Sequence, residues 1–395
     1  IARLADVVAG YFVPVVLGFG LVAGTGWLLA GHSLAFALQV FVAVLIIACP
    51  CSLGLATPAA IMVGAGRGAQ LGILVKRPEA LEVAERLDAV VLDKTGTITE
   101  GKPQVAAIFP APGYSEEQLL RLAAAVERGS EHPLGAAIIA AAGEREIAVP
   151  DAEGFAATPG QGAQATVGGQ EVVVGNGAMM AAQGVAVSGV ATGRTLAYVA
   201  IDGSLVGTIA LADRPRPSSK DGIARLRAQG LEVVMLTGDS RAAAEAIATE
   251  VGIEVIHAEV LPGDKAAVVQ SLQVEGRRVA MVGDGVNDGP ALAAADVGIA
   301  IASGTDVAAE SADVVLMHSR LTDVARAVEL SRAVMRTIRQ NLFWAFFYNA
   351  AGIPVAAGVL YLFGGPLLNP MLASLAMAFS SVSVVANALR LRRFG

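Results

Sequence analysis

Four apolar stretches constrain this chain most, because a bilayer-spanning helix needs about 20 mostly apolar residues. They cover residues 7–30, 34–57, 342–363 and 367–389, and the short links GHS and GGP turn each pair into a hairpin. Hydrophobic residues form 54% of the chain, above the roughly 45–50% of an average soluble domain. We therefore expect four transmembrane helices, two at each end of the chain.

The positions of basic residues predict how these helices are oriented. The short links contain no Lys or Arg, whereas the sequence near the free ends of both pairs contains Arg67, Lys76, Arg77, Arg332, Arg336, Arg339, Arg390, Arg392 and Arg393. By the positive-inside rule, these free ends lie in the cytoplasm. The Ala- and Gly-rich composition favours a bacterial inner (plasma) membrane. A net charge of −7 argues against a nucleic-acid partner, which would favour a basic surface.

The sequence between the helix pairs alternates strand-like and helix-like segments. Runs such as LDAVVLD, LEVVMLTGD and RRVAMVGD end in aspartate, and helical patterns alternate with them. This alternation predicts a parallel α/β sheet with ligands at the carboxyl ends of its strands. The pattern changes to helices and Gly-punctuated strands over residues 103–211, which predicts an inserted lobe. The expected segments are two membrane helices with a CPC sequence (1–58), a connector and first α/β part (59–102), the inserted lobe (103–211), a second α/β part (212–335), and two membrane helices with a basic tail (336–395).

The motif DKTGTIT, residues 93–99, places a carboxylate directly after the strand AVVL. A carboxylate at a strand end is suited to attack a phosphoryl group, and the reaction depends on positioning and charge neutralisation. Asp284 would share Mg²⁺ with Asp93, Lys265 would supply positive charge, and Thr237 would supply a hydroxyl and an amide. One such Asp could simply cap a turn or helix. Four such motifs in this order favour phosphoryl transfer.

The strings DKTGTITEG, MLTGD, PGDK and MVGDGVNDGPAL resemble the phosphorylation domain of P-type ATPases, within the haloacid dehalogenase superfamily. The resemblance implies membrane helices joined to an α/β phosphorylation domain that carries an inserted α+β nucleotide-binding domain. It implies that Asp93 is phosphorylated by ATP, with Mg²⁺ held by Asp93, Thr95 and Asp284. The further catalytic positions that it implies are Lys94, Thr95, Thr237, Gly238, Asp239, Lys265, Asn287 and Asp288.

The inserted lobe contains SEHPLG at residues 130–135, which alone could be a helix start with Ser as the cap. Together with TPGQGA and VGN, it resembles the nucleotide-binding domain of heavy-metal P-type ATPases. The resemblance implies that Glu131 and His132 contact adenine. Glycines would let the backbone approach the nucleotide, and the residues expected to line the cleft are Gly160, Gly162, Gly175 and Asn176. The chain has no G-x-x-x-x-G-K-[ST] string, so a P-loop does not hold the ATP.

Cys49 and Cys51, the only cysteines, flank Pro50 within the second apolar stretch. A proline in a membrane helix frees carbonyl groups, which is tolerated where the backbone lines a protected site. Thiolates select soft cations such as Cu(I), so the pair predicts a transient metal site; two small buried apolar residues beside a kink are the alternative. An i, i+2 pair in a helix points its side chains apart, so we expect no disulfide.

The third and fourth apolar stretches resemble those of copper-exporting P-type ATPases. That resemblance implies that Tyr348, Asn349, Met377 and Ser381 complete the copper site, although polar groups here could equally join helices. Zinc and cadmium exporters share the CPC sequence but use an acidic residue in the last helix, and none lies in residues 342–389. We expect export of Cu(I), with Ag(I) open and a Zn, Cd or Pb exporter as the alternative. A membrane-anchored phosphatase is the less favoured interpretation.

Several parts of a complete pump are missing, so we expect the chain to be a fragment. No TGE string of an actuator domain is present, and the resemblance implies earlier membrane helices as well. We expect that the chain alone does not transport. The expected partners are membrane lipid, ATP, a copper ion, a copper chaperone and the missing parts of the parent protein. His32, His257 and His318 lack metal-ligand spacing, so we expect them on the surface or in loops.

Overall fold

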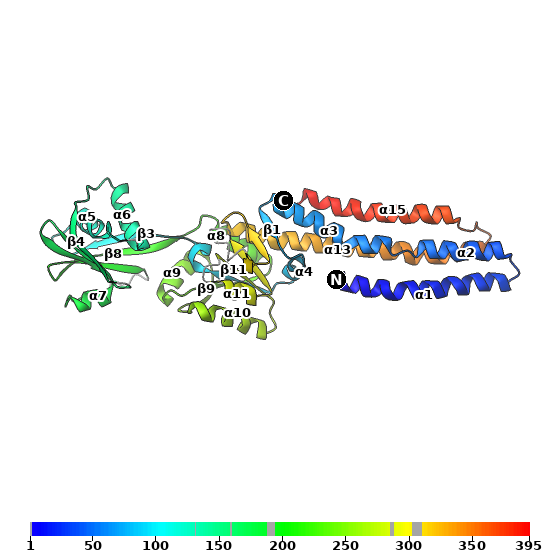
Figure 1. The fold of residues 1–395 in the computed structure, drawn as a ribbon, viewed down its shortest axis with the longest axis horizontal. Helices are drawn as coiled ribbons and strands as arrows, with labels where there is room; N and C mark the ends of the chain where they lie inside the picture. Colours follow the sequence, from blue (N-terminus) through cyan, green and yellow to red (C-terminus); the bar gives the residue numbers. More distant parts are fainter. Residues whose placement is uncertain (1, 131, 159, 188–193, 285–287, 302–309) are drawn as a thin grey trace. The chain divides into compact units, whose positions relative to one another are not determined.

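The computed structural model describes residues 2–130, 132–158, 160–187, 194–284, 288–301 and 310–395 (Figure 1). The chain divides into two compact units. The helical unit comprises Ile1–Leu87, Asp313–Met317 and Arg326–Gly395, and the α/β unit comprises Asp88–Ala312 and His318–Ala325. Both termini therefore belong to the helical unit. The predicted class, apolar helices combined with α/β and inserted α+β parts, is confirmed.

The helical unit consists of long apolar helices and two short antiparallel strands. Its elements are α1 (Ala2–Leu29), α2 (Leu34–Ile47), α3 (Cys51–Gln70), β1 (Ile73–Val75), α4 (Glu79–Ala84), β13 (Val314–Leu316), most of α13 (Leu321–Ala356), α14 (Val359–Leu362), α15 (Pro370–Leu389) and a 3-10 turn at Arg390–Arg393. Among the described residues, three helical stretches are long and apolar enough to cross a membrane, namely Gly10–Leu29, Leu34–Gln70 and Pro370–Arg393.

The third predicted span, residues 342–363, is not one of these three stretches. Its helix, α13, ends at Ala356, and the left-handed Gly358 (φ +93°) separates it from the short α14. Polar side chains and Pro354 also make this part of α13 less apolar than its neighbours. By length and composition the third predicted span is therefore not a candidate membrane span among the described residues, because α13 ends at Ala356 and Gly358 interrupts the helical run.

An aromatic cluster joins the two hairpin ends of the helical unit. The rings of Trp27, His32, Phe36 and Tyr361 contact one another, with the His32 ring stacked on Phe36 at a centroid distance of 4.5 Å. Trp27 Nε1–H also donates to the carbonyl of Ala357 at 2.9 Å. His32 lies in the link between α1 and α2, in a loop as expected, and these ring contacts leave it half-buried. His257 lies in strand β10 rather than in a loop.

The α/β unit contains five parallel strands in the order β12-β11-β2-β9-β10. Four of them are buried along their whole length or nearly so, as expected for Val-rich strands with helices on both faces. The strands are β2 (Ala89–Asp93), β9 (Glu232–Leu236), β10 (Val255–His257), β11 (Val279–Gly283) and β12 (Val297–Ile301), and the helices are α8 (Ser219–Ala228), α9 (Arg241–Val251), α10 (Lys265–Val274) and α11 (Gly289–Ala294).

The inserted lobe is a six-stranded antiparallel sheet in the order β3-β8-β7-β6-β5-β4. Helices α5 and α6 cover one face, where Leu119, Ile138 and Val172 share a core, and α7 covers the other, where Met180 packs on Val173 (Figure 1). The elements are β3 (Thr99–Pro110), α5 (Glu116–Glu127), α6 (Pro133–Glu144), β4 (Ala152–Thr158), β5 (Gly162–Val167), β6 (Gln170–Gly175), α7 (Gly177–Ala182), β7 (Thr195–Ile201) and β8 (Ser204–Pro215).

Strands β3 and β8 carry the chain into and out of this lobe, and they pair from Thr99 opposite Pro215 onward. One carboxylate, Asp213 on β8, fastens the two strands at this crossing. It accepts hydrogen bonds from the Thr99 hydroxyl and from the backbone N–H groups of Gly101 (3.0 Å) and Lys102 (3.2 Å). The sequence pattern did not single out Asp213.

Candidate active site

Asp93 lies at the carboxyl end of β2, the central parallel strand, as its motif predicts. Its carboxylate is buried, and Lys265 Nζ, at the start of α10, donates to Oδ1 at 2.6 Å. The same ammonium donates to Asp288 Oδ1 at 2.7 Å. Side-chain exposures of 6%, 9% and 1% for Asp93, Lys265 and Asp288 show that this carboxylate–ammonium–carboxylate group is almost fully removed from water.

The electrostatics of this group follow from its burial. Burial, together with the neighbouring Asp288 carboxylate, raises the pKa of Asp93 to about 7, although Lys265 opposes the increase. The two carboxylates in turn raise the pKa of Lys265 above its ordinary value, against the effect of burial. The ammonium therefore keeps its charge, and Asp93 is the group that exchanges a proton near neutral pH.

The DKTGT loop after β2 is shaped by close backbone contacts. Gly96 has φ +74°, and a side chain there would collide with the Asp284 carboxylate. Arg216 Nη2 donates to the Gly96 carbonyl at 2.6 Å, and Ser219 Oγ donates to the Ile98 carbonyl at 2.6 Å. These bonds fix the loop against the chain that returns from the inserted lobe, so the carboxylate is held on a rigid support.

The donor set at this strand end fits magnesium. Asp284 follows β11, the strand next to β2, and its charge contributes to the raised pKa of Asp93. A divalent cation would relieve the repulsion between these carboxylates. In the described part of the chain, no three His, Cys, Asp or Glu side chains gather as a metal site. Phosphate and water oxygens would therefore supply most of the remaining ligands.

The other predicted catalytic residues lie around the same strand ends. Thr237 follows β9 and is buried, with its hydroxyl accepting from Asp239 N–H at 3.1 Å. Asp239 in turn pairs with Lys94, whose side chain is buried. Thr95 is exposed on the loop. Gly238 follows Thr237, and a side chain there would approach the Val260 carbonyl to 3.3 Å. Asn287 lies outside the described residues.

A pocket of about 280 Å³ in the inserted lobe brings together five predicted nucleotide residues. His132, Gly160, Gly162, Gly175 and Asn176 all line it, while Glu131 lies outside the described residues. The pocket walls include apolar side chains from α6, β6 and β7, as a flat adenine ring requires. The structure thus groups these residues, and their contact with nucleotide stays a prediction.

The glycines and Asn176 have structural reasons that differ from the predicted one. Gly162 and Gly175 are paired across β5 and β6, and a side chain on Gly175 would meet the Gln161 carbonyl at 2.7 Å. Asn176 caps α7 and donates to the Gly160 carbonyl at 3.0 Å. Of the three glycines, only Gly160 (φ +73°) borders open space. Asn176 therefore holds the Gly160 loop in place, and close strand packing explains the other two glycines.

His132, not Ser130, caps helix α6, so the helix start predicted from the sequence placed the cap two residues early. His132 Nδ1 accepts from Leu134 N–H at 3.2 Å, and Pro133 occupies the first helical position. The neutral ring then carries its proton on Nε2. Ser130 instead accepts from the His132 N–H at 3.2 Å. The cap orients an imidazole that lines the pocket.

Glu127 is the pocket residue that sequence reasoning missed. It is the last residue of α5, is only 7% exposed and lines the pocket with His132. Burial raises the pKa of Glu127, while Ser130 and His132 oppose the increase. Gly135 leaves space for its carboxylate, because a side chain there would collide with Oε2. A glutamate that ends an apolar helical run, five residues before the histidine, was the available signal.

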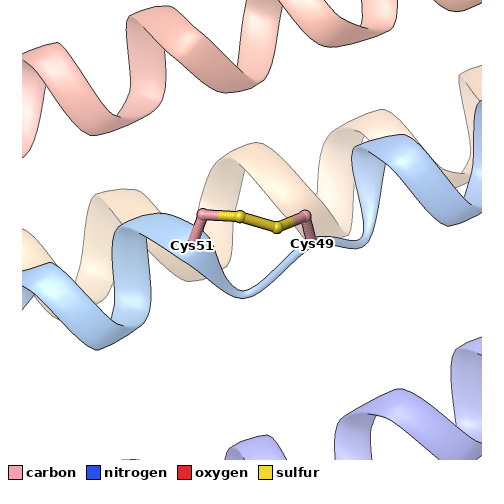
Figure 2. Close-up of a disulfide and its surroundings, with 2 residues drawn as sticks. All are labelled: Cys49 and Cys51. Atoms are coloured by element: carbon pink, nitrogen blue, oxygen red, sulfur yellow. A yellow bond between two sulfur atoms is a disulfide. The ribbon is translucent and has the colours of Figure 1, made fainter.

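The two cysteines lie at a break between helices rather than inside one helix (Figure 2). Helix α2 ends at Ile47 and α3 begins at Cys51, so Cys49 and Pro50 form an irregular link. The cysteines form a disulfide with a Cα–Cα distance of 5.4 Å. The expectation that their side chains point apart is wrong, because it assumed a continuous helix. Metal binding by both thiols therefore requires the reduced pair.

The other predicted metal ligands lie on α13 and α15. Asn349 and Met377 are 5% and 7% exposed, whereas Tyr348 is 38% exposed. Helix α15 packs against α2 and α3, the helices that flank the cysteines. Ser381 is half-buried, but its neighbour Ser380 is fully buried, and neither Ser380 Oγ nor Asn349 Oδ1 has a hydrogen-bond partner among the described residues.

Comparison with known protein families identifies the family of this chain. A model for haloacid dehalogenase-like hydrolases matches residues 87–296, and a second model of that description matches residues 265–328. The chain belongs to this family. The match contains Asp93, Lys265 and the strand ends described above, together with the whole inserted lobe.

This dehalogenase-like chain also resembles P-type ATPases along its full length, as predicted. It is 53% identical to a probable copper-exporting P-type ATPase V of Mycobacterium tuberculosis, over 100% of this chain and 52% of the relative. It is 50% identical to a silver exporting P-type ATPase of Salmonella typhimurium, over 99% and 49%. The chain thus spans about half the length of the curated relatives it matches.

A solved structure of a zinc-transporting PIB-type ATPase in an E2.Pi state shares the fold, with a TM-score of 0.85 and 39% identity. The match covers 97% of this chain and 62% of that structure. The likeness includes both the helical and the α/β parts. Together with the three apolar stretches, it confirms that the dehalogenase-like chain is an integral membrane protein.

Proposed function

We propose that this chain forms the catalytic and metal-binding part of an ATP-driven Cu(I) exporter that is phosphorylated on Asp93. The observation that supports it most is the buried Asp93–Lys265–Asp288 group at the end of the central strand. A surface carboxylate would need no such partner. A carboxylate with a buried ammonium beside one oxygen is arranged to accept a phosphoryl group.

In the proposed reaction, Asp93 attacks the γ-phosphorus of ATP. A bond forms from the carboxylate oxygen to phosphorus, the bond to the β–γ bridging oxygen breaks, and ADP leaves with that electron pair. Asp93 Oδ2 accepts no hydrogen bond from a described residue, so it is the oxygen free to attack. Lys265 stays charged and lies next to the developing phosphoryl charge, while Asp288 holds Lys265 in position.

Magnesium, when bound by Asp93 and Asp284, would neutralise phosphate charge. The protein then needs to supply two further things. Asp93 must be ionised, which its raised pKa opposes in the absence of a cation. Adenine must be held at a distance from the reacting phosphate, and the pocket lined by Glu127 and His132 provides apolar walls and two polar groups for this.

The cargo follows from the chemistry of the helical unit. Two thiols and the thioether of buried Met377 are soft ligands, and no acidic residue lies in residues 342–389. Such a set suits a monovalent soft ion better than Zn²⁺, and the copper- and silver-exporting names of the relatives agree with it. Zinc export is the second candidate, because the structural relative is described as zinc-transporting.

Phosphorylation is tested by incubating the chain with γ-labelled ATP and Mg²⁺ and measuring label that survives acid. We expect acid-stable, hydroxylamine-sensitive label in the unmodified chain and none in Asp93→Asn. The matched control is Asp221→Asn, whose carboxylate is 58% exposed on α8 and which should be labelled normally. Equal labelling of the Asp93→Asn chain would refute the proposal.

The cargo is tested by competition binding with the reduced chain. Cu(I) or Ag(I) should bind more tightly than Zn²⁺, and Cys49→Ser and Met377→Leu should each weaken Cu(I) binding. Met371→Leu is the matched control on the same helix, because Met371 is 79% exposed. Tighter Zn²⁺ binding would favour the zinc alternative, and Cu(I) binding that survives loss of Cys49 would refute the proposed thiol site.

A further inference from the structure

A pocket of about 180 Å³ lies between α13 and α15 in the helical unit, and the proposed phosphoryl transfer does not use it. Trp344 and Tyr348 on its α13 side are 48% and 38% exposed, so the pocket is open on the outside of the described helices. Since these helices belong to an integral membrane protein, we expect lipid on that side. Tyr348 is the only predicted copper ligand among the residues that line the pocket, which are Asn341, Trp344, Tyr348, Ser383, Val384 and Asn387.

The polar side chains of the α13–α15 pocket are already hydrogen-bonded within the protein. Asn341 is buried, its Nδ2 donates to the Ala56 carbonyl at 3.1 Å, and its Oδ1 accepts from Asn387 Nδ2 at 2.9 Å. Ser383 Oγ donates to the Ser380 carbonyl at 2.7 Å. The surface that remains for a ligand is aromatic and aliphatic, which suits an acyl chain better than a hydrated ion.

Two guanidinium groups lie at one end of this pocket. Arg390, directly after α15, donates to Asn387 Oδ1 at 3.2 Å, and Asn387 Nδ2 donates to Gln340 Oε1 at 3.2 Å. Arg336, Gln340 and Trp344 follow one another at four-residue intervals on α13, which places them on one face of the helix. Arg336 therefore lies beyond Gln340 on the face that leads into the pocket. By the positive-inside rule, this is the cytoplasmic end.

The charges of these two arginines are not neutralised by the described residues. Arg336 is exposed and has no ion-pair or hydrogen-bond partner in the described part of the chain, and the partner of Arg390 is a neutral amide. By contrast, Arg339 pairs with Glu85 at 2.6 Å. Residues 330–395 contain no Asp or Glu. Two such guanidinium groups favour a phosphodiester, because each binds phosphate oxygens in pairs and the cytoplasmic leaflet carries anionic lipids.

We propose that the α13–α15 pocket binds one anionic phospholipid of the cytoplasmic leaflet. An acyl chain lies against Trp344, and the phosphate lies between Arg336 and Arg390. Twelve residues separate Arg336 from Tyr348, or about 18 Å along the helix at roughly 1.5 Å per residue. Half of the hydrocarbon core of a bilayer is about 15 Å thick, so one lipid reaches from the arginines to the far end of the pocket. The bound lipid joins α13 to α15 and thereby stabilises the helical unit.

The test measures the fluorescence of Trp344 in a Trp27→Phe chain, where Trp344 is the only remaining tryptophan. The chain is placed in bilayer discs of phosphatidylcholine in which a minor fraction of the lipid has brominated acyl chains, which quench a tryptophan that they contact. The brominated lipid is either phosphatidylglycerol or phosphatidylcholine. We expect a preference of about 25-fold for phosphatidylglycerol, because each arginine near the membrane surface contributes about fivefold.

The arginine variants show whether this preference comes from the proposed site. Arg336→Gln and Arg390→Gln should each reduce it about fivefold, and the double variant should abolish it. Arg392→Gln is the matched control, because it removes the same charge from the same short turn and Arg392 is exposed. Quenching by brominated phosphatidylcholine should be equal in all of these chains, which a general disturbance of the helices would not allow.

A second measurement keeps both tryptophans, because Trp27 also bonds to the Ala357 carbonyl. Phosphatidylglycerol added to the detergent should raise the melting temperature of the unmodified chain, and neither phosphatidylcholine nor loss of both arginines should leave that increase in place. Four results would overturn the proposal. They are equal quenching by both lipids in the unmodified chain, an equal loss of preference in Arg392→Gln, quenching that soluble glycerol 3-phosphate relieves, and a Trp344 that neither brominated lipid reaches in the longer parent protein.

Discussion

Replacing Lys265 with methionine removes the charge between two buried carboxylates and keeps most of the side-chain volume. Lys265 Nζ lies 2.6 Å from Asp93 Oδ1 and 2.7 Å from Asp288 Oδ1. Breaking a buried ion pair by removing one partner destabilises a protein by about 3–5 kcal/mol, because a charge is left uncompensated. For a unit of this size, such a loss lowers the melting temperature by about 6–20 °C.

The loss in Lys265→Met should depend on pH in a direction set by the carboxylates. In the unmodified chain Lys265 has a raised pKa, so its contribution is fully present at all pH values below its ordinary pKa. In the variant, Asp93 can take up a proton as the pH falls below about 7, the pKa that it has even beside the ammonium. The repulsion between the carboxylates then decreases. The destabilisation should be smaller at pH 5.5 than at pH 8.

Thermal unfolding of the α/β unit in detergent, followed by near-ultraviolet circular dichroism at both pH values, measures this effect. Lys220→Met is the matched control, because Lys220 is exposed on α8, and it should leave the melting temperature within about 1 °C. A decrease below about 2 °C in Lys265→Met, or an equal decrease at pH 5.5 and pH 8, would contradict the electrostatic reasoning.

Contacts elsewhere in the molecule lead to three more expected outcomes. Glu127→Gln should raise the melting temperature at neutral pH, because the raised pKa of Glu127 means that its ionisation destabilises the fold as pH rises. The variant should also lose an acid-range pH step in adenosine binding. An unchanged pH profile of adenosine binding would exclude a role of the Glu127 carboxylate in that pocket. Gly64→Ala should destabilise the helical unit by about 1–3 kcal/mol, because its methyl would collide with Val334 Cγ2, and Val334→Ala should restore most of the loss in a double variant. Cu(I) binding should be absent in the disulfide form of Cys49 and Cys51 and should appear after reduction, which titration with and without a thiol reductant measures.

The sequence predicted that Asp93, Thr237 and Asp284 gather at one edge of the sheet, because parallel strands bring their carboxyl ends together; their roles stay predictions. Asp93, Thr237 and Asp284 each follow a buried strand, so strand order alone places them together. The Lys265 contacts could not be predicted, since they depend on where α10 begins relative to the sheet. Asp213 was missed for a similar reason: a strand aspartate gives no sign in the sequence that three donors on another strand converge on it.

Errors in the membrane part came from assuming regular helices. The Cys49–Cys51 pair was treated as part of a continuous helix, whereas the break at Pro50 turns both side chains to one side (Figure 2). Ser381 stays a predicted ligand; its neighbour Ser380 is the fully buried serine of α15, because adjacent residues on a helix lie about 100° apart and the sequence does not fix the rotation of the helix. Glu127 was missed because the sequence does not show that the fold buries the end of α5.

The three hydrogen bonds that Asp213 accepts limit how the inserted lobe can move. If β3 and β8 were two separate linkers, the lobe could twist and tilt freely. Here the Asp213 carboxylate on β8 accepts hydrogen bonds from Thr99, Gly101 and Lys102 of the incoming strand β3. Strands β3 and β8 therefore bend together as a two-stranded ribbon, which bends easily across its flat face and resists bending within its plane. We therefore expect the β3–β8 ribbon to bend mainly across its flat face when the inserted lobe moves.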